Sequence, residues 1–238
     1  MELIDLSVPI VTGMPVYPGD PEVTIGSALT VARDGVNVLG LHLGSQSGTH
    51  VDAPFHIDDA LPTLDELPLE RFVGPAVVVD ARGLEPRSAI GPSVFEEVFE
   101  EVSGQVSGEV SGQVRAASIV LVATGWSAHW GTDAYLAHPY LTEEAAALLV
   151  GRGVRTVGID ALSVDPTPAP DLPAHRVLCG AHAVIAENLT GLDRLLRAQA
   201  DGLSVEVSML PIRLGGADGA PVRAVARLTG QAQRVPQE

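Results

Sequence analysis

The segment GTHVDAPFH, residues 48–56, brings two histidines and an aspartate close together in the chain. The residues leading into it alternate between apolar and polar types, which is typical of a strand, and residues two apart in a strand face the same side. We therefore expect His50 and Asp52 to point together, with Pro54 ending the strand and His56 turning back toward them. Imidazole nitrogens and carboxylate oxygens are ligands of Zn²⁺ and similar divalent ions, so this spacing predicts part of a metal site.

A second set of candidate ligands lies in residues 174–188, AHRVLCGAHAVIAEN. A metal ion needs more ligands than one His–Asp pair, which on its own is more often a structural pair. His175 follows the proline-rich segment 165–173, a composition typical of a loop at the rim of a pocket. Glu187 follows an apolar run, and because burying an unpaired carboxylate is costly, its position favours a metal or a cationic partner. His182 has no such argument and is expected to pack or to lie at the surface.

The elements that must position these residues are indicated by hydrophobic patterning. Three runs rich in valine and isoleucine predict buried strands at 75–81, 117–124 and 155–161. Residues 142–153 predict a helix with a threonine cap and a glycine end, and residues 189–202 predict a second helix. The order strand, helix, strand is typical of an α/β unit.

The two ends of the chain predict further strands. The N-terminal residues 2–10 read as one strand, and residues 203–214 and 220–230 alternate as two strands joined by GGADG. The segment 95–115 contains a short Val-Ser-Gly repeat and is interpreted as a low-complexity surface excursion, with one or two helical turns at its start. Because no other composition shift suggests a linker, residues 1–238 are expected to form a single domain.

Composition excludes several classes of function. The chain has 238 residues, 46% of them hydrophobic, and a net charge of −16. All 14 basic residues are arginines, and no basic stripe could neutralise nucleic-acid phosphates or bind an anionic membrane. Cys179 is the only cysteine, the N-terminus lacks the basic and apolar regions of a signal peptide, and no segment reaches about 20 apolar residues. We therefore expect a cytoplasmic protein.

The segment QSGTHVDAPFH, residues 46–56, is similar to the signature His-x-Gly-Thr-His-x-Asp-x-Pro-x-His of the cyclase family. This family of metal-dependent hydrolases includes bacterial kynurenine formamidases and isatin hydrolases. The match fails only at Gln46, where the signature has histidine. The opening residues 5–20, the core around 121–126 and the spacing of twelve between His175 and Glu187 also resemble the family.

The resemblance implies a role for each matching residue. The implied metal ligands are His50, Asp52, His175 and Glu187, with Asp52 able to bridge two ions. His56 would be the general acid and base, and Tyr17 and Thr49 would lie at the substrate, with Gly48 and Thr49 shaping the turn. Gln46 would be a weaker ligand than imidazole, so the resemblance implies one or two ions per chain, Zn²⁺ before Mn²⁺.

The resemblance also implies a fold and an activity. The fold would be a swivelling β/β/α-type single α/β domain with a mixed, partly barrel-like sheet and flanking helices. The activity would be hydrolysis of an amide-type C–N bond in a small molecule, an aryl formamide like N-formylkynurenine or a cyclic amide. Family members imply a homodimer or homotetramer with the segment around Tyr17 near a neighbouring subunit. The alternatives are a metal-dependent cyclase or lyase acting on a ketone, and a non-catalytic binding homologue, against which the retention of His56 argues.

Overall fold

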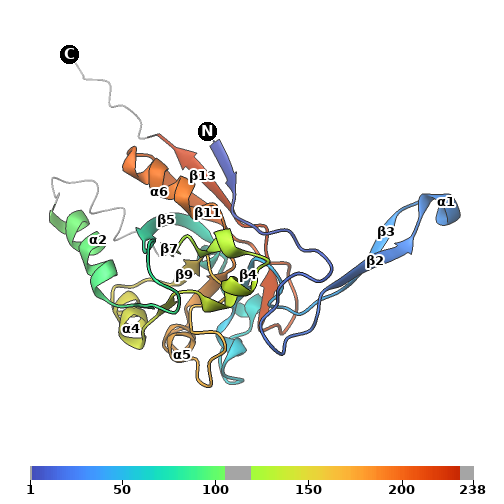
Figure 1. The fold of residues 1–238 in the computed structure, drawn as a ribbon, viewed down its shortest axis with the longest axis horizontal. Helices are drawn as coiled ribbons and strands as arrows, with labels where there is room; N and C mark the ends of the chain where they lie inside the picture. The colour runs from blue at the N-terminus through green and yellow to red at the C-terminus, as the bar shows by residue number, and fades with distance from the viewer. Residues whose placement is uncertain (1, 105–118, 231–238) are drawn as a thin grey trace, which may run out of the picture.

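A mixed β-sheet forms the frame of the molecule (Figure 1). The structure, a computed structural model, describes residues 2–104 and 119–230. Among these residues, nine strands form one sheet that curls into a half-barrel. Across the sheet they are β1 (Glu2–Asp5), β13 (Val225–Thr229), β11 (Ser204–Ser208), β5 (Val73–Asp80), β7 (Ile119–Ala123), β9 (Thr156–Ile159), β10 (Val184–Glu187), β4 (His50–Asp52) and β12 (Gly219–Pro221).

The central strands β5, β7, β9 and β10 run parallel, and the outer strands pair antiparallel. Successive residues of β7 enter two different cores: Leu121 packs in one and Val120 and Val122 in the other. Both faces of this part of the sheet are therefore covered, which explains why its strands read as unbroken apolar runs.

Helices cover the two faces of the sheet. Helix α6 (Leu192–Ala200) packs on one core, while α4 (Glu143–Gly151) and α5 (Pro173–Gly180) pack on the other. Thr142 begins α4 by accepting a hydrogen bond on Oγ1 from the Ala145 backbone N–H at 3.1 Å. The remaining elements are α1 (Val31–Asp34), α2 (Ser93–Gly104), β2 (Thr24–Leu29), β3 (Val38–His42), β6 (Ala89–Ile90) and β8 (Tyr140–Leu141). No helix within the described residues is long and apolar enough to cross a membrane.

The sequence-based expectation of a mixed sheet with flanking helices is confirmed. The three apolar runs are strands β5, β7 and β9, and the two predicted helices are α4 and α6. The N-terminal strand is shorter than expected, ending at Asp5.

Three expectations need correction. The tail forms three strands, because the segment after GGADG becomes β12 beside β4, while β11 pairs with β13. The start of 95–115 is not a surface excursion, since Phe95 and Phe99 of helix α2 are buried in the core. The Val-Ser-Gly repeat beyond residue 104 lies outside the described residues. Finally, the alternation before His50 is not one long strand: β3 ends at His42, and a turn separates it from β4.

Strands β2 and β3 form an arm that sequence patterning did not reveal. The two strands pair antiparallel and carry α1 at their tip. Figure 1 shows the arm projecting away from the body of the molecule. Every residue of β3 is exposed, and Leu39 and Leu41 are 60% and 62% exposed.

Candidate metal centre

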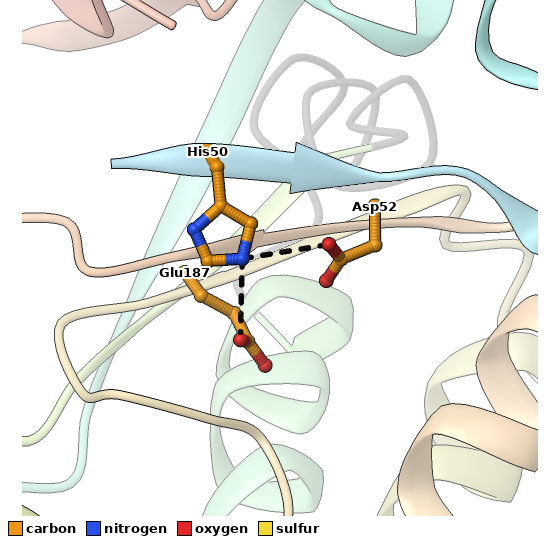
Figure 2. Close-up of side chains that lie close together, drawn as sticks. All are labelled: His50, Asp52 and Glu187. Atoms are coloured by element: carbon orange, nitrogen blue, oxygen red, sulfur yellow. Dashed lines mark ion pairs between the residues drawn. The ribbon is translucent and has the colours of Figure 1, made fainter. Parts of the chain in front are cut away.

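Strand β4 carries two of the predicted ligands and has a neighbouring strand on each side. β4 lies between β10 and β12, and its residue His50 is directly opposite Glu187 of β10. His50 and Asp52 are two apart and face the same side, while Val51 between them is buried in the apolar core. Figure 2 shows the side chains of His50, Asp52 and Glu187 pointing toward one another. The sheet register therefore brings together residues that lie more than 130 positions apart.

The four predicted ligands form one buried cluster. His50 Nε2 lies 3.4 Å from Asp52 Oδ1 and 3.5 Å from Glu187 Oε2. His175 Nε2, on α5, lies 3.8 Å from Asp52 Oδ2 and 3.5 Å from Glu187 Oε1. Each carboxylate thus presents one oxygen to each histidine, and none of the four residues is more than 5% exposed.

The geometry of this cluster fits a divalent cation. Both carboxylate oxygens of Asp52 are buried and have no hydrogen-bond partner within the described part of the chain. Such orphaned oxygens are costly unless a cation meets them. Ligands about 2.0–2.2 Å from a tetrahedral ion lie roughly 3.3–3.6 Å apart, which is the range of the closest His–carboxylate distances here. His50, Asp52 and Glu187 also place one ligand atom each within 4.8 Å of one another.

Hydrogen bonds at the far nitrogens orient the two histidines. His50 Nδ1 donates to the Gly48 carbonyl oxygen at 2.8 Å, which turns Nε2 toward the cluster. His175 Nδ1 donates to Asp165 Oδ2 at 2.7 Å. Asp165 is fully buried and accepts two further hydrogen bonds from the backbone N–H groups of Ala174 and His175. Partners of this kind fix the tautomer and the orientation of metal-binding histidines.

The charges of the cluster shift the pKa of both histidines. Burial lowers the pKa of His50, but Asp52 and Glu187 outweigh it and raise the pKa to about 9. Burial also lowers the pKa of His175, but its hydrogen bond with Asp165 and the nearby negative charges of Asp52 and Glu187 raise it to about 10. Without a cation the carboxylates therefore hold protons on both imidazoles. A cation that binds here displaces those protons.

His56 stands beside the cluster. It ends the short 3₁₀ turn Pro54–His56, and its ring centroid lies 5.8 Å from that of His175. Its Nδ1 lies 3.3 Å from Asp218 Oδ2 and 3.0 Å from Gln46 Nε2. Burial lowers the pKa of His56, but the hydrogen bond with Asp218 and the charge of Asp52 raise it overall.

A cavity of about 360 Å³ opens over the cluster. His50, Asp52, His175 and Glu187 line it together with His56 and Gln46. Residues 169–172 form one wall, and Tyr17 lines the cavity while its hydroxyl oxygen accepts a hydrogen bond from the Ala169 N–H at 3.2 Å. A cavity of this size suits a small-molecule ligand.

Thr49 has a different position from the other predicted site residues. It does not line the cavity. Its buried hydroxyl donates to the Asn188 carbonyl oxygen at 2.6 Å and accepts from the Val8 N–H at 2.9 Å. It therefore joins the turn before β4 to the end of β10 and to the N-terminal segment. His182 is exposed, as expected.

Asp165, Asn188 and Asp218 contact the predicted site residues or the turn before β4, and none of the three was predicted as a site residue. Asn188 adopts a left-handed φ of 57°, and its Nδ2 donates to the Gly48 carbonyl oxygen at 2.9 Å. The sequence held one signal for it, since an asparagine directly after an apolar strand is a frequent left-handed residue. No local sequence pattern distinguishes Asp165 or Asp218 from other aspartates, and their contacts become visible only in the folded structure.

The fold and the site together define a mixed α/β protein with a buried His–carboxylate cluster, able to hold a metal ion, beneath a cavity. The sequence pattern of the cyclase family matches residues 4–166. The chain is 36% identical to the kynurenine formamidase of Salinibacter ruber over 229 residues, 95% of this chain and 98% of that protein. It is 32% identical to the kynurenine formamidase of Bacillus thuringiensis strain Al Hakam over 228 residues, 95% and 97% of the two chains.

Solved structures show the same fold. Isatin hydrolase A of Labrenzia aggregata has a TM-score of 0.79 at 24% identity, covering 97% of this chain and 94% of that one. An isatin hydrolase bound to thioisatinate has a TM-score of 0.81 at 22% identity, covering 97% and 93%. The chain belongs to the cyclase family, and its relatives are hydrolases.

Proposed function

We propose that this chain is a metal-dependent amidohydrolase that cleaves the C–N bond of a small aryl formamide, of the N-formylkynurenine type, or of a cyclic amide. The observation that carries the proposal is the buried cluster around Asp52, whose two unpartnered oxygens face two oriented histidines at the floor of the cavity. The kynurenine formamidases that resemble the chain over nearly its whole length support the choice of substrate class.

The proposed metal site uses His50, Asp52, His175 and Glu187. A divalent ion bound there supplies Lewis acidity, which polarises an amide carbonyl and makes water a stronger nucleophile near neutral pH. Zn²⁺ is the first candidate and Mn²⁺ the second, because mixed nitrogen and oxygen ligands suit both. Since each carboxylate presents one oxygen to each histidine, these four side chains would supply the donors for one ion or for two.

His56 is the proposed proton carrier. It lines the cavity and is only partly buried, so it can meet both substrate and solvent. His56 takes a proton from the attacking water and returns it to the nitrogen that leaves, so that the amide becomes a carboxylic acid and an amine. An imidazole suits both steps because its protonated and neutral forms interconvert near neutral pH. Tyr17 is the proposed contact for a substrate ring, since this aromatic residue lines the same cavity.

We further propose that the protein works in the cytoplasm as a homodimer or homotetramer on a small-molecule substrate. The single buried cysteine suits a reducing compartment. The net charge of −16 argues against nucleic acid and anionic membranes as partners.

A paired measurement tests the function. Metal content per chain is determined by elemental analysis, and the same preparation is assayed for formate release from N-formylkynurenine and for ring opening of a panel of cyclic amides. We expect one or two ions per chain, and turnover that a chelator abolishes and Zn²⁺ or Mn²⁺ restores. A fully metal-loaded protein that hydrolyses none of these amides would exclude the proposed activity.

A further inference from the structure

Gln46 and Asp218 meet at Nδ1 of His56. Gln46 Nε2 donates to Asp218 Oδ2 at 2.9 Å and lies 3.0 Å from His56 Nδ1. The same Asp218 oxygen lies 3.3 Å from His56 Nδ1 and accepts from Ser45 Oγ at 3.2 Å. Asp218 Oδ2 thus contacts the Gln46 amide, the Ser45 hydroxyl and the His56 imidazole.

The arrangement gives His56 Nδ1 a partner whether or not it carries a proton. Without a proton, Nδ1 accepts a hydrogen bond from Gln46 Nε2. With a proton, Nδ1 donates to Asp218 Oδ2, a charge-assisted hydrogen bond. The ring can therefore keep one orientation throughout a proton-transfer cycle, and Nε2 is left as the nitrogen that exchanges protons.

The fold is built to hold the Gln46 amide in this place. Asp218 precedes β12, whose first residue Gly219 lies opposite Asp52 of β4. A Cβ atom at position 219 would lie 2.7 Å from Gln46 Oε1, 2.9 Å from Gln46 Nε2 and 2.6 Å from the Val51 carbonyl oxygen. Only glycine leaves room there for the amide beside the strand.

We infer that Gln46 and Asp218 are positioning residues for His56, and that the Gln46 amide serves this imidazole and not the metal. Nε2, an amide nitrogen that does not bind cations, is the Gln46 atom that faces Asp218 and His56, while Oε1 lies beside Gly219 of β12, buried and without a hydrogen-bond partner within the described residues. The inference rests on the proposed hydrolysis, because it gives His56 the proton transfer. It also explains why the chain can depart from the family signature at this position.

A double-mutant cycle tests the role of Asp218. Asp218→Asn keeps the size of the side chain, and we expect kcat to fall by about 10–100-fold with KM and metal content unchanged, as for other orienting partners. In a His56→Ala background, Asp218→Asn should cause no further loss, because residues that act as a unit are not additive. An additive loss in the double variant would mean that Asp218 does not act through His56.

The matched control is Asp65→Asn. Asp65 holds the same loop by accepting a hydrogen bond from the Gly216 N–H at 2.9 Å, but it does not touch His56. We expect kcat to be unchanged in this variant. If loosening the loop lowers kcat as much as Asp218→Asn does, the effect is structural and the inference fails.

The role of Gln46 is tested by metal content and by NMR, neither of which needs turnover. We compare Gln46→Ala with Gln46→Met, which keeps side-chain length in case the smaller residue destabilises the fold. Both should keep the wild-type number of Zn²⁺ ions per chain while shifting the imidazole ¹⁵N signals of His56, assigned by their loss in His56→Ala. Loss of metal, or unchanged His56 signals, overturns the inference. If the wild-type chain hydrolyses no amide, the proposed function fails, while the His56 signals of the Gln46 variants still decide whether Gln46 contacts this imidazole.

Discussion

At the scale of single residues, the proposed mechanism assigns cation binding and proton transfer to different side chains. Asp52 has both oxygens in the buried cluster, whereas His56 lies at its side and points Nδ1 toward Asp218. The two residues are four positions apart, but a strand holds the first and a 3₁₀ turn holds the second.

His56→Ala should therefore keep the metal and lose turnover. We expect kcat to fall by about 10²–10⁴-fold, the usual contribution of positioned proton transfer. Asp52→Ala should lose metal and activity together, because it removes both carboxylate oxygens that would bind the cation, one beside each histidine. Elemental analysis and steady-state kinetics on both variants check this. The assignment of roles is wrong if His56→Ala strips the metal while Asp52→Ala retains it.

The raised pKa of His50 and His175 predicts how pH affects the metal-free protein. Their values of about 9 and about 10 exceed the value of about 6.5 expected in the unfolded chain. The protonated pairs with Asp52 and Glu187 thus add stability that is fully present below about pH 6.5 and is lost as pH rises through 9 to 10. The melting temperature of the metal-free protein should therefore fall as pH is raised from 6 to 10.

Saturating Zn²⁺ should remove this fall, since the bound histidines are already neutral. Metal affinity should rise with pH over the same range, because fewer protons need to be displaced. If the melting temperature of the metal-free protein stays constant from pH 6.5 to 10, the pKa of His50 and His175 is not raised in the way described.

At the scale of elements, strand register and a helix start place the ligands. β4 and β10 put His50 opposite Glu187, and the first turn of α5 supplies His175, whose partner Asp165 lies in the segment before the helix. Asp165 also satisfies two backbone N–H groups in the first turn of α5, so one carboxylate fixes both the helix start and the imidazole.

Asp165→Asn should weaken metal binding by about 10–100-fold, because His175 loses a charged partner that orients its ring. A Zn²⁺ titration with a competing chelator measures the change. Asp171→Asn is the control, since Asp171 lies in the same loop and is largely exposed. Equal losses of affinity in the two variants would show that the loop as a whole, and not the bond to His175, controls the site.

The sequence predicted the parts of the site that depend on local spacing. His50 and Asp52 follow from strand alternation, and the apolar run before Glu187 indicated a buried carboxylate. Asp218 could not be predicted, because nothing near it in the chain shows that β12 adds to the sheet beside β4. The β2–β3 arm was missed because its exposed leucines and valines lack the one-sided pattern of a half-buried strand.

At the scale of the whole molecule, the arm is the largest feature without a partner in the described chain. A two-stranded hairpin is marginally stable alone in water. This one also exposes apolar side chains that a monomer would normally bury: Leu29, Val31, Val36, Val38, Leu39 and Leu41. An exposed apolar surface of this kind is typical of a subunit interface.

We therefore expect the arm to be the contact between copies of this chain. Leu39→Asp combined with Leu41→Asp should convert the oligomer to a monomer, measured by light scattering over a range of concentrations. Glu22→Gln outside the arm is the control and should leave the mass unchanged. A wild-type chain that is monomeric at every concentration would refute the expected assembly.

The pairing of β1 with β13 has a consequence for synthesis of the chain. Residues 2–5 pair with residues 225–228, so the first strand made finds its place only after the last one leaves the ribosome. The same delay applies to His50 and Asp52, whose strand gains its outer neighbour β12 only when residues 219–221 appear. Contacts so distant in sequence close slowly, and the waiting strands have unpaired edges. During translation β2 and β3 can therefore pair with each other early, whereas β1 stays without its sheet neighbour until almost the whole polypeptide has been made.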